Sequence, residues 1–432
     1  MTDAAIVSIG TELTRGELVN GNARWLGERL VELGFTVVEH ATVDDDAGRI
    51  RGTLLRIGNP AGLGPAGQPN AVKVIVCTGG LGPTSDDLTT AAVADALGVA
   101  LVRDPASLAK IEARYRNANR NMPASNAKQA DFPEGARILD NDAGTAPGFA
   151  VTIGQAQAFF TPGVPREMEH IFENQIAPAI ASLVERRSHQ VHIRTFGLFE
   201  SAVAERLRDL DAGGERHHPG ITIGYRVTFP EVEVKVLAEA RDHDEARALA
   251  ERTAAEVRER LSDAAFGGKG ETYANYVTGL LKAARLKVAV AESCTGGLLG
   301  KLLTDAPGSS DYMLGGVISY ANSAKIRLLG VDEKLIASVG AVSEEVARAM
   351  AEGVLRLTEA DLAVAITGIA GPTGGTEQKP VGTVCFALAR KAGDTLTFTE
   401  RFSGARDFVR TISAYRALRL FANAAKELAP NL

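Results

Sequence analysis

A short stretch after residue 290 contains the residues best suited to nucleophilic chemistry. Residues 286–290 are mostly apolar, which is typical of a buried strand, and residues 298–303 form an amphipathic stretch that predicts a helix. Ser293, Cys294, Thr295 and two glycines lie between them. A sharp turn from strand to helix exposes a hydroxyl and directs backbone N–H groups at the atom it attacks. The pattern therefore indicates either a nucleophilic Ser293 or a helix cap that binds an anion without catalysis.

A serine nucleophile needs a neighbouring base at neutral pH, and the usual histidine is missing. All seven histidines lie at or before His243, so the chain from Gly267 onward contains none. The remaining option is a lysine whose pKa is lowered by burial or by a neighbouring charge. Lys325 is the candidate, because it lies 32 residues after Ser293, on the first turns of a predicted helix. Cys294 is a rival nucleophile, but its thiolate would need a lysine or a helix N-terminus beside it.

A second glycine-rich loop follows an apolar run at residues 72–76 and leads into a predicted helix after Thr89. Its glycines would let the backbone approach an anion, and the helix would add its positive end. The loop carries two adjacent carboxylates, and three more follow the strand that ends at Val43. A divalent cation could bridge such carboxylates to phosphates at the carboxyl ends of parallel strands. The alternative is that these residues only cap the helices that follow them.

The surrounding segments predict three regions. Strands and helices alternate between residues 4 and 76, which indicates a parallel sheet covered on both faces. Two adjacent strands at residues 221–229 and 231–238, between helices, indicate a small α+β domain. We expect domains at residues 1–168, 169–264 and 265–432, with a linker at 262–270. Residues 58–70 contain four glycines and three prolines and predict a surface insertion.

Composition narrows the class of protein. The 432 residues are 45% hydrophobic and 23% charged, as in ordinary globular proteins. Three cysteines form no disulfide framework, no apolar run has transmembrane length, and residues 1–5 resemble no secretion signal, so we expect a cytoplasmic protein. The net charge is −6, and the part before Gly267 carries −9, a poor surface for nucleic acid. We interpret the short basic cluster at residues 186–194 as a solvated face.

Three separated blocks resemble the carboxy-terminal domain of the CinA family. They are residues 292–297, residues 319–325 and the glycine-rich residues 367–375, which continue into 379–384. In that family the domain is a nicotinamide mononucleotide deamidase. The resemblance implies Ser293 as nucleophile, Lys325 as its base, and Tyr320 as a hydrogen-bonding relay between them.

Further substrate contacts are expected around the same domain. The turn would hold the oxyanion, and the glycine loop would bind the substrate phosphate together with Arg406 or Arg410. The residues expected to contact substrate are Thr295, Gly296, Gly297, Gly371, Gly374, Gly375 and Arg406.

The amino-terminal blocks resemble the molybdopterin-binding fold as the same family uses it. These blocks are residues 10–13, 43–46, 78–89, 144–149 and 160–168. Family members hydrolyse the pyrophosphate of ADP-ribose with a divalent metal (Mg, Mn or Co) and potassium. The resemblance implies metal contacts at Asp45, Asp87, Asp86 and Glu12, and substrate contacts at Gly79, Gly80, Gly82, Thr84 and Thr145. Asp44 stands where the family commonly has glycine and Asp46 where it has asparagine, so the assignment among these three aspartates stays open.

The resemblance implies an α/β protein: a three-layer molybdopterin-binding-like domain, a small α+β domain and an α/β deamidase domain. We expect a homodimeric hydrolase that recycles pyridine nucleotides. It would convert nicotinamide mononucleotide to nicotinate mononucleotide and ammonia, and ADP-ribose to AMP and ribose 5-phosphate, without binding nucleic acid or membrane. The alternative is a nucleotide-binding regulatory or scaffold protein with a degenerate amino-terminal site. The family's link to competence and DNA damage is a genetic association rather than a chemistry.

Overall fold

The computed structural model describes residues 2–59 and 72–429. The expected surface insertion therefore lies almost entirely outside the described residues. The chain divides into two compact units. One contains the residues up to Gln190 together with Leu237–Ala250, and the other contains Val191–Val236 together with the residues from Glu251 onward. No helix among the described residues is long and apolar enough to cross a membrane.

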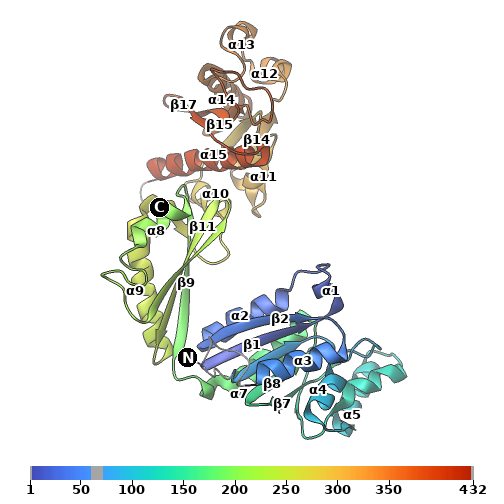
Figure 1. Ribbon diagram of the computed structural model, residues 1–432. Helices are drawn as coiled ribbons and strands as arrows, with labels where there is room; N and C mark the ends of the chain where they lie inside the picture. Colours follow the sequence, from blue (N-terminus) through green and yellow to red (C-terminus); the bar gives the residue numbers. More distant parts are fainter. Residues whose placement is uncertain (1, 60–71, 430–432) are drawn as a thin grey trace. The chain divides into compact units, whose positions relative to one another are not determined.

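A six-stranded sheet in the order β2-β1-β3-β8-β7-β6 forms the centre of the amino-terminal domain (Figure 1). Four strands are parallel: β1 (Thr2–Ile9), β2 (Phe35–Val43), β3 (Val74–Thr78) and β8 (Ala156–Thr161). Two are antiparallel to their neighbours: β7 (Gly148–Ile153) and β6 (Arg137–Leu139). Strand β3 is buried at every residue, as the prediction of a sheet covered on both faces requires.

Helices cover both faces of this sheet. On one face α3 (Ala47–Gly58) and α4 (Thr89–Leu97) pack with Val7 and Ile75. On the other face α2 (Gly21–Leu33), α6 (Pro165–Ile171) and α7 (Ala177–Ile180) pack with Ile6 and Val76. Alternate residues of β1 and β3 thus face opposite layers. The predicted boundary after residue 168 falls inside α6, because that helix completes the core of the first sheet.

Smaller elements extend this domain. The short helix α1 (Thr11–Thr14) follows β1, and α5 (Pro105–Asn117) follows β4 (Leu101–Arg103). Strand β4 pairs with β5 (Asp131–Pro133) in a separate two-stranded sheet.

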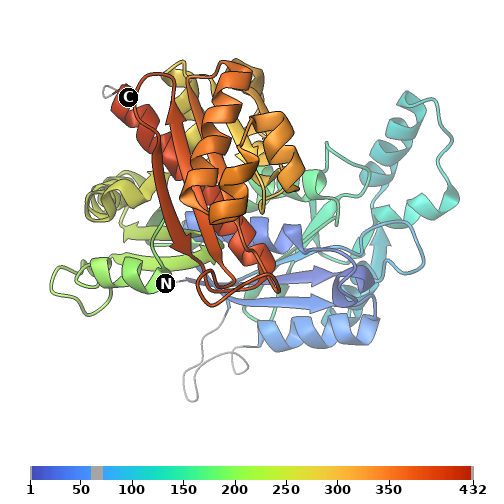
Figure 2. The same cartoon turned by 90° about the horizontal axis from the view of Figure 1, so that it is seen from above.

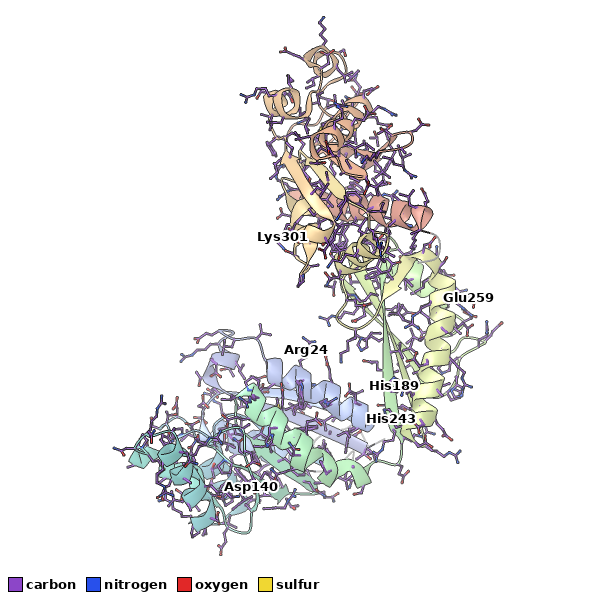
Figure 3. All side chains as sticks on the ribbon, turned by 180° about the vertical axis from the view of Figure 1, so that it is seen from behind. Arg24, Asp140, His189, His243, Glu259 and Lys301 are labelled. Carbon is purple, nitrogen blue, oxygen red and sulfur yellow. The ribbon has the colours of Figure 1, made fainter. Side chains whose placement is uncertain are left out.

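The middle region contains a four-stranded sheet in the order β10-β11-β9-β12. Its elements are β9 (Arg187–Phe196), α8 (Glu200–Leu207), β10 (Ile221–Thr228), β11 (Glu231–Ala240), α9 (His243–Leu261) and β12 (Ala265–Gly267). This arrangement agrees with the predicted small α+β domain. His189 of β9 and His243 of α9 lie side by side (Figure 3), with their ring centroids 5.5 Å apart and their planes nearly perpendicular.

The basic cluster at residues 186–194 is not the solvated face that we expected. Most of it forms β9, where His192 Nδ1 lies 3.0 Å from Glu233 Oε1 and Arg194 Nε donates to Glu231 Oε2 at 3.2 Å. Glu231 and Glu233 are themselves buried. Charges removed from water need such partners.

The carboxy-terminal domain contains a five-stranded sheet in the order β14-β13-β15-β16-β17. Strands β13 (Val288–Glu292), β14 (Met313–Ile318) and β15 (Leu362–Gly368) are parallel, whereas β16 (Thr383–Arg390) and β17 (Leu396–Arg401) are antiparallel to their neighbours. The carboxyl ends of the three parallel strands share one edge of the sheet, where ligands commonly bind in open α/β sheets.

Helices flank this sheet on both sides (Figure 2). One face is covered by α10 (Tyr273–Ala283), α11 (Leu298–Thr304) and α15 (Arg406–Leu428). The other is covered by α12 (Asn322–Leu329), α13 (Glu333–Val339) and α14 (Glu344–Thr358). The turn after β13 and helix α12 therefore start at the same edge of the sheet.

Candidate active site

Ser293 and Lys325 meet at the carboxyl edge of the carboxy-terminal sheet. Strand β13 ends at Glu292, and the Ser293 N–H donates to the carbonyl oxygen of Ile366 on β15 at 2.9 Å, which fixes the start of the turn. Lys325, in α12, donates from Nζ to Ser293 Oγ at 3.2 Å. Both residues are buried, with Ser293 8% and Lys325 1% exposed. The structure thus brings together the serine and the lysine that the sequence singled out.

The surroundings of Lys325 favour its neutral form. Burial lowers the pKa of Lys325 below the ordinary value of 10.5, because an ammonium group loses hydration inside the protein. Nζ also donates to the carbonyl oxygen of Ser319 at 2.7 Å. A neutral amine held in this way keeps its lone pair for the proton of the Ser293 hydroxyl. A serine hydroxyl beside a neutral amine is an arrangement that can serve as a nucleophile with its general base.

Cys294 is placed as a packing residue. Its side chain belongs to the apolar core that also contains Leu299 and Val384. Burial raises the pKa of the Cys294 thiol to about 12, so the thiol is protonated at neutral pH. A methyl group added at Gly368 would lie 3.1 Å from the sulfur, which shows how closely the backbone of β15 approaches it. These surroundings disfavour the rival cysteine nucleophile.

Glu292 is a buried carboxylate whose role we did not predict. Its Oε2 accepts hydrogen bonds from the N–H groups of Gly297 at 3.0 Å and Leu299 at 3.1 Å, and Oε1 accepts one from Gly300 at 2.8 Å. It therefore satisfies the free donors at the start of α11 and lies at the positive end of that helix. The sequence does carry a signal, because a glutamate that ends an apolar strand before a glycine turn needs nearby donors.

Glu292 changes which groups of the turn face a ligand. The N–H of Gly297 is bound to Glu292, and the N–H of Gly296 donates to the Ser293 carbonyl at 3.1 Å. Thr295 is fully buried, yet its Oγ1 has no hydrogen-bond partner within the described part of the chain. A buried hydroxyl without a partner is costly. Both glycine N–H groups of the turn thus already have acceptors within the protein, whereas the Thr295 hydroxyl has none among the described residues.

Two arginines of α15 contact the segments around Ser293. Arg406 donates from Nη1 to the carbonyl oxygen of Gly371 at 2.7 Å and from Nη2 to the Tyr320 hydroxyl at 2.8 Å. Arg410, one turn later, donates from Nη2 to the carbonyl oxygen of Thr295 at 2.9 Å. Its Nε is buried and has no partner among the described residues. Tyr320 is 61% exposed, and its hydroxyl contacts Arg406, while Lys325 reaches Ser293 directly.

The glycine loop after β15 is a tightly held turn. Gly371 and Gly374 have φ angles of 83° and 92°, a region that favours glycine. Gly375 approaches the backbone so closely that a Cβ would lie 2.7 Å from the Val381 nitrogen. Lys379 Nζ donates to the carbonyl oxygens of residues 339 and 342, at 2.6 and 2.7 Å, which holds the loop against the end of α13 and the segment between α13 and α14. The three glycines thus have a conformational role besides any contact with substrate.

In the amino-terminal domain the two carboxylates of interest lie on separate loops. Asp45 Oδ2 accepts hydrogen bonds from the N–H and the hydroxyl of Thr11, both at 2.8 Å. Asp87 Oδ2 accepts hydrogen bonds from the N–H of Thr84 at 2.8 Å and from the Thr84 hydroxyl. A Cβ at Gly82 would lie 2.5 Å from the same oxygen, so the loop needs glycine there. One oxygen of Asp87 thus holds its own loop, and one oxygen of Asp45 joins its loop to the start of α1.

The neighbouring acidic residues have structural partners. Asp46 caps α3 by accepting the Arg49 N–H at 2.9 Å, and Asp44 forms an ion pair with Arg49 at 2.6 Å. The hydrogen bond from Thr84 lowers the pKa of Asp86. The capping alternative thus applies to Asp46, while Asp45 and Asp87 have different partners.

The other positions expected at this site lie around the same edge of the first sheet. Gly79 and Gly80 form the tight turn directly after β3. Glu12 lines a pocket of about 240 Å³ together with Asn22 and Thr78. Thr145 follows Gly144, whose N–H donates to Asn141 Oδ1 at 2.8 Å. Within residues 2–59 and 72–429, no three His, Cys, Asp or Glu side chains gather in a group that could hold a metal ion.

Comparisons with known proteins match all three regions. Residues 5–182 match the family model "Probable molybdopterin binding domain", residues 190–267 match "Damage-inducible protein CinA KH domain", and residues 270–425 match "CinA C-terminal domain". The first range includes α6 and α7, in agreement with their packing on the first sheet.

Relatives of similar length cover nearly the whole chain. The CinA-like proteins of Geobacter sulfurreducens and Geobacter metallireducens are 42% and 41% identical over 419 residues, 96% of this chain and 97% of theirs. The solved structure of the competence/damage inducible protein CihA from Agrobacterium tumefaciens is 38% identical and covers 36% of this chain and 93% of that one, with a TM-score of 0.35. The chain belongs to the CinA family, with a molybdopterin-binding-like domain followed by the family's KH and carboxy-terminal domains.

Proposed function

We propose that the carboxy-terminal domain deamidates nicotinamide mononucleotide to nicotinate mononucleotide and ammonia. The observation that carries the proposal is the buried hydrogen bond of 3.2 Å between Lys325 Nζ and Ser293 Oγ. Membership of the CinA family supports a hydrolase-like function in general. A serine with a neutral amine as its base is suited to attack on a carboxamide, because the same amine can return its proton to the leaving nitrogen.

The proposed reaction has two halves. In the first, Lys325 takes the proton of Ser293 as Oγ bonds to the carboxamide carbon; the carbon–nitrogen bond then breaks, and the proton leaves with ammonia. In the second, water gives a proton to Lys325 and attacks the acyl-serine, and that proton returns to Ser293 as the acid is released. The unpartnered hydroxyl of Thr295 would donate to the oxyanion of each tetrahedral intermediate.

Arg406 and Arg410 are proposed to bind the phosphate of the substrate. Both guanidinium groups contact segments that surround Ser293, and Arg410 Nε lacks a partner in the described residues. Guanidinium groups pair well with phosphate because their donors match its oxygens. Lys325 needs no relay in this scheme, so Tyr320 is proposed to act by holding Arg406.

The direct test is turnover by the full chain. Purified protein is incubated with nicotinamide mononucleotide, and ammonia and nicotinate mononucleotide are quantified together. We expect both products in equal amounts. Binding without turnover would instead favour the alternative of a nucleotide-binding regulatory or scaffold protein.

For the amino-terminal domain we propose metal-dependent hydrolysis of ADP-ribose to AMP and ribose 5-phosphate. Asp45 and Asp87 each have one oxygen without a hydrogen bond in the described part of the chain, and both follow strands of the parallel sheet. Mg²⁺, Mn²⁺ or Co²⁺ fits this donor set only if substrate phosphates and water complete the coordination, because no group of three ligating side chains is present among the described residues.

In this second proposal a bound metal would polarise the pyrophosphate. The protein's own residues hold the loops in place. Lys128 Nζ donates to the carbonyl oxygens of Thr84 and Asp87 at 2.8 and 2.6 Å, and thereby fixes the acidic loop. Thr11, at the start of α1, donates its N–H and its hydroxyl to the Asp45 carboxylate. Hydrolysis of ADP-ribose with and without chelator tests the proposal.

A further inference from the structure

Helix α15 presents opposite faces to the candidate active site and to the middle sheet. Arg406 and Arg410 are one turn apart and therefore lie on one side of the helix. Phe408 is two residues from each, which corresponds to about 200° of helical rotation and puts it on the far side. Tyr415 and Arg419 follow Phe408 at helical spacing and share its face. The face behind the arginines is thus a continuous stripe of large side chains.

The middle sheet packs along this stripe. Phe229, in the two-residue connection between β10 and β11, stacks on Phe408 with ring centroids 4.6 Å apart and planes 23° apart. Phe196 of β9 lies 5.4 Å from the Tyr415 ring, between centroids. A Cβ at Gly197 would lie 2.5 Å from Arg419 Nη1. All these residues belong to the same compact unit, and Figure 1 shows one end of β11 close to α15.

The buried carboxylate of Glu231, directly after this connection, ties the end of the hairpin to its neighbours through hydrogen bonds. The residue is 2% exposed, and its carboxylate accepts the Tyr273 N–H at 3.0 Å and Arg194 Nε at 3.2 Å. Burial, together with the nearby Glu231 carboxylate to which it hydrogen bonds, raises the pKa of Tyr415. A buried carboxylate with this many partners tolerates little displacement. The end of the β10–β11 hairpin is therefore fixed relative to α10 and α15.

The contact with Phe229 lies at the first turns of α15, where Arg406 and Arg410 also hydrogen bond to Gly371, Tyr320 and Thr295. The helix begins after Ala405, which provides no side-chain cap. An uncapped first turn frays more readily than a capped one. Arg406 lies in that turn and Arg410 in the next, so movement at this end shifts both guanidinium groups relative to Ser293. The Phe229 ring stacks on the side chain between them.

We propose that the β10–β11 hairpin positions the phosphate-binding arginines of the Ser293 site, with Phe229 as the positioning residue. This inference rests on the proposed deamidase function and extends it to the middle domain. Loss of the Phe229 ring leaves the chemistry at Ser293 and Lys325 intact and loosens Arg406 and Arg410. The hairpin thereby contributes to selecting carboxamides that also carry a phosphate.

The test compares two substrates with the same carboxamide, nicotinamide mononucleotide and nicotinamide riboside, which lacks the phosphate. In the full chain, Phe229→Ala is expected to raise KM for the mononucleotide about five- to tenfold, because an aromatic pair is lost, and to change kcat by less than about twofold. Values of kcat/KM for the riboside stay within about twofold of the wild type. Phe229→Trp, which keeps an aromatic ring, restores the KM of the wild type.

The matched control is Phe199→Ala, which removes an 81% exposed phenylalanine at the start of α8 in the same region. This variant is expected to behave as the wild type on both substrates. An equal loss on both substrates in Phe229→Ala, or an unchanged KM for the mononucleotide, would overturn the positioning role.

A second measurement separates this inference from the proposed reaction. If the wild type releases no ammonia, the deamidase proposal fails, and binding of nicotinamide mononucleotide is then measured by calorimetry in the Ser293→Ala background. A Kd that Phe229→Ala raises about five- to tenfold supports the positioning role. A Kd that does not change rejects it.

Discussion

Lys325 donates its shorter hydrogen bond, 2.7 Å, to the carbonyl oxygen of Ser319 and its longer one, 3.2 Å, to Ser293 Oγ. A backbone carbonyl can only accept, so it orients the amine without competing for the serine proton. In serine hydrolases that use histidine, a third group orients the base in the same way. Here that third group belongs to the segment between β14 and α12, and no acidic side chain is required.

The first prediction concerns the nucleophile. Ser293→Ala is expected to abolish ammonia release from nicotinamide mononucleotide, because no other hydroxyl receives the Lys325 hydrogen bond in the described residues. Cys294→Ala should retain substantial activity, since the thiol is buried and protonated. Initial rates of ammonia release by the two variants decide whether Ser293 or Cys294 is the nucleophile. An essential Cys294 with a dispensable Ser293 would reverse the assignment.

The second prediction concerns the base. Deamidation should accelerate as pH rises through the pKa of Lys325, with a midpoint below 10.5, because burial lowers this pKa and only the neutral amine accepts a proton. Lys325→Arg should be nearly as inactive as Lys325→Ala, because a guanidinium group stays protonated. The measurement is the pH–rate profile of the three proteins, with folding checked by circular dichroism. Near wild-type turnover in a folded Lys325→Arg protein would reject the lysine base.

The third prediction concerns Tyr320. Removing its hydroxyl takes one acceptor from Arg406, so Tyr320→Phe is expected to raise KM for the mononucleotide by about threefold and to leave kcat nearly unchanged. A relay between Ser293 and Lys325 would instead lower kcat by about ten- to a hundredfold. Steady-state kinetics at saturating substrate distinguish the two roles.

The fourth prediction concerns stability. Glu292→Gln replaces one of the two oxygens that accept three backbone hydrogen bonds with an amide nitrogen, which leaves at least one N–H without an acceptor. The free energy of unfolding should fall by about 1–3 kcal/mol. Glu377→Gln, at an exposed loop position, is the control and should have no measurable effect. Urea unfolding of both variants gives the comparison; equal midpoints would contradict the role of Glu292.

The fifth prediction concerns the amino-terminal domain. Asp87→Asn should lower metal-dependent hydrolysis of ADP-ribose by about tenfold or more, whereas Ser293→Ala should leave it unchanged. Asp46→Asn is the matched control, because asparagine also caps helices and α3 keeps its cap. Release of AMP is followed with and without chelator. Full activity of Asp87→Asn, or of the wild type in excess chelator, would remove the metal from this site.

The meeting of Ser293 and Lys325 was predictable because both follow parallel strands, whose carboxyl ends share one edge. The hydrogen-bond partners of the glycine N–H groups could not be predicted, because Glu292 accepts from this turn only once α11 has formed beside it. The pairing of Arg194 with Glu231 could not be predicted from the sequence for a related reason. The two residues are far apart in sequence, and only the strand order of the middle sheet brings them together.

Glu292 also determines where attraction for a charged substrate arises. Its carboxylate lies on the N–H groups that begin α11, so the positive end of that helix is already neutralised. Under the proposed function, a nucleotide approaching Ser293 would be attracted by Arg406 and Arg410 on α15 rather than by α11. Higher ionic strength should therefore weaken substrate binding by screening the charges of α15 alone. Changes of charge on α15 would then shift the preferred class of amide while the nucleophile and its base stay as they are.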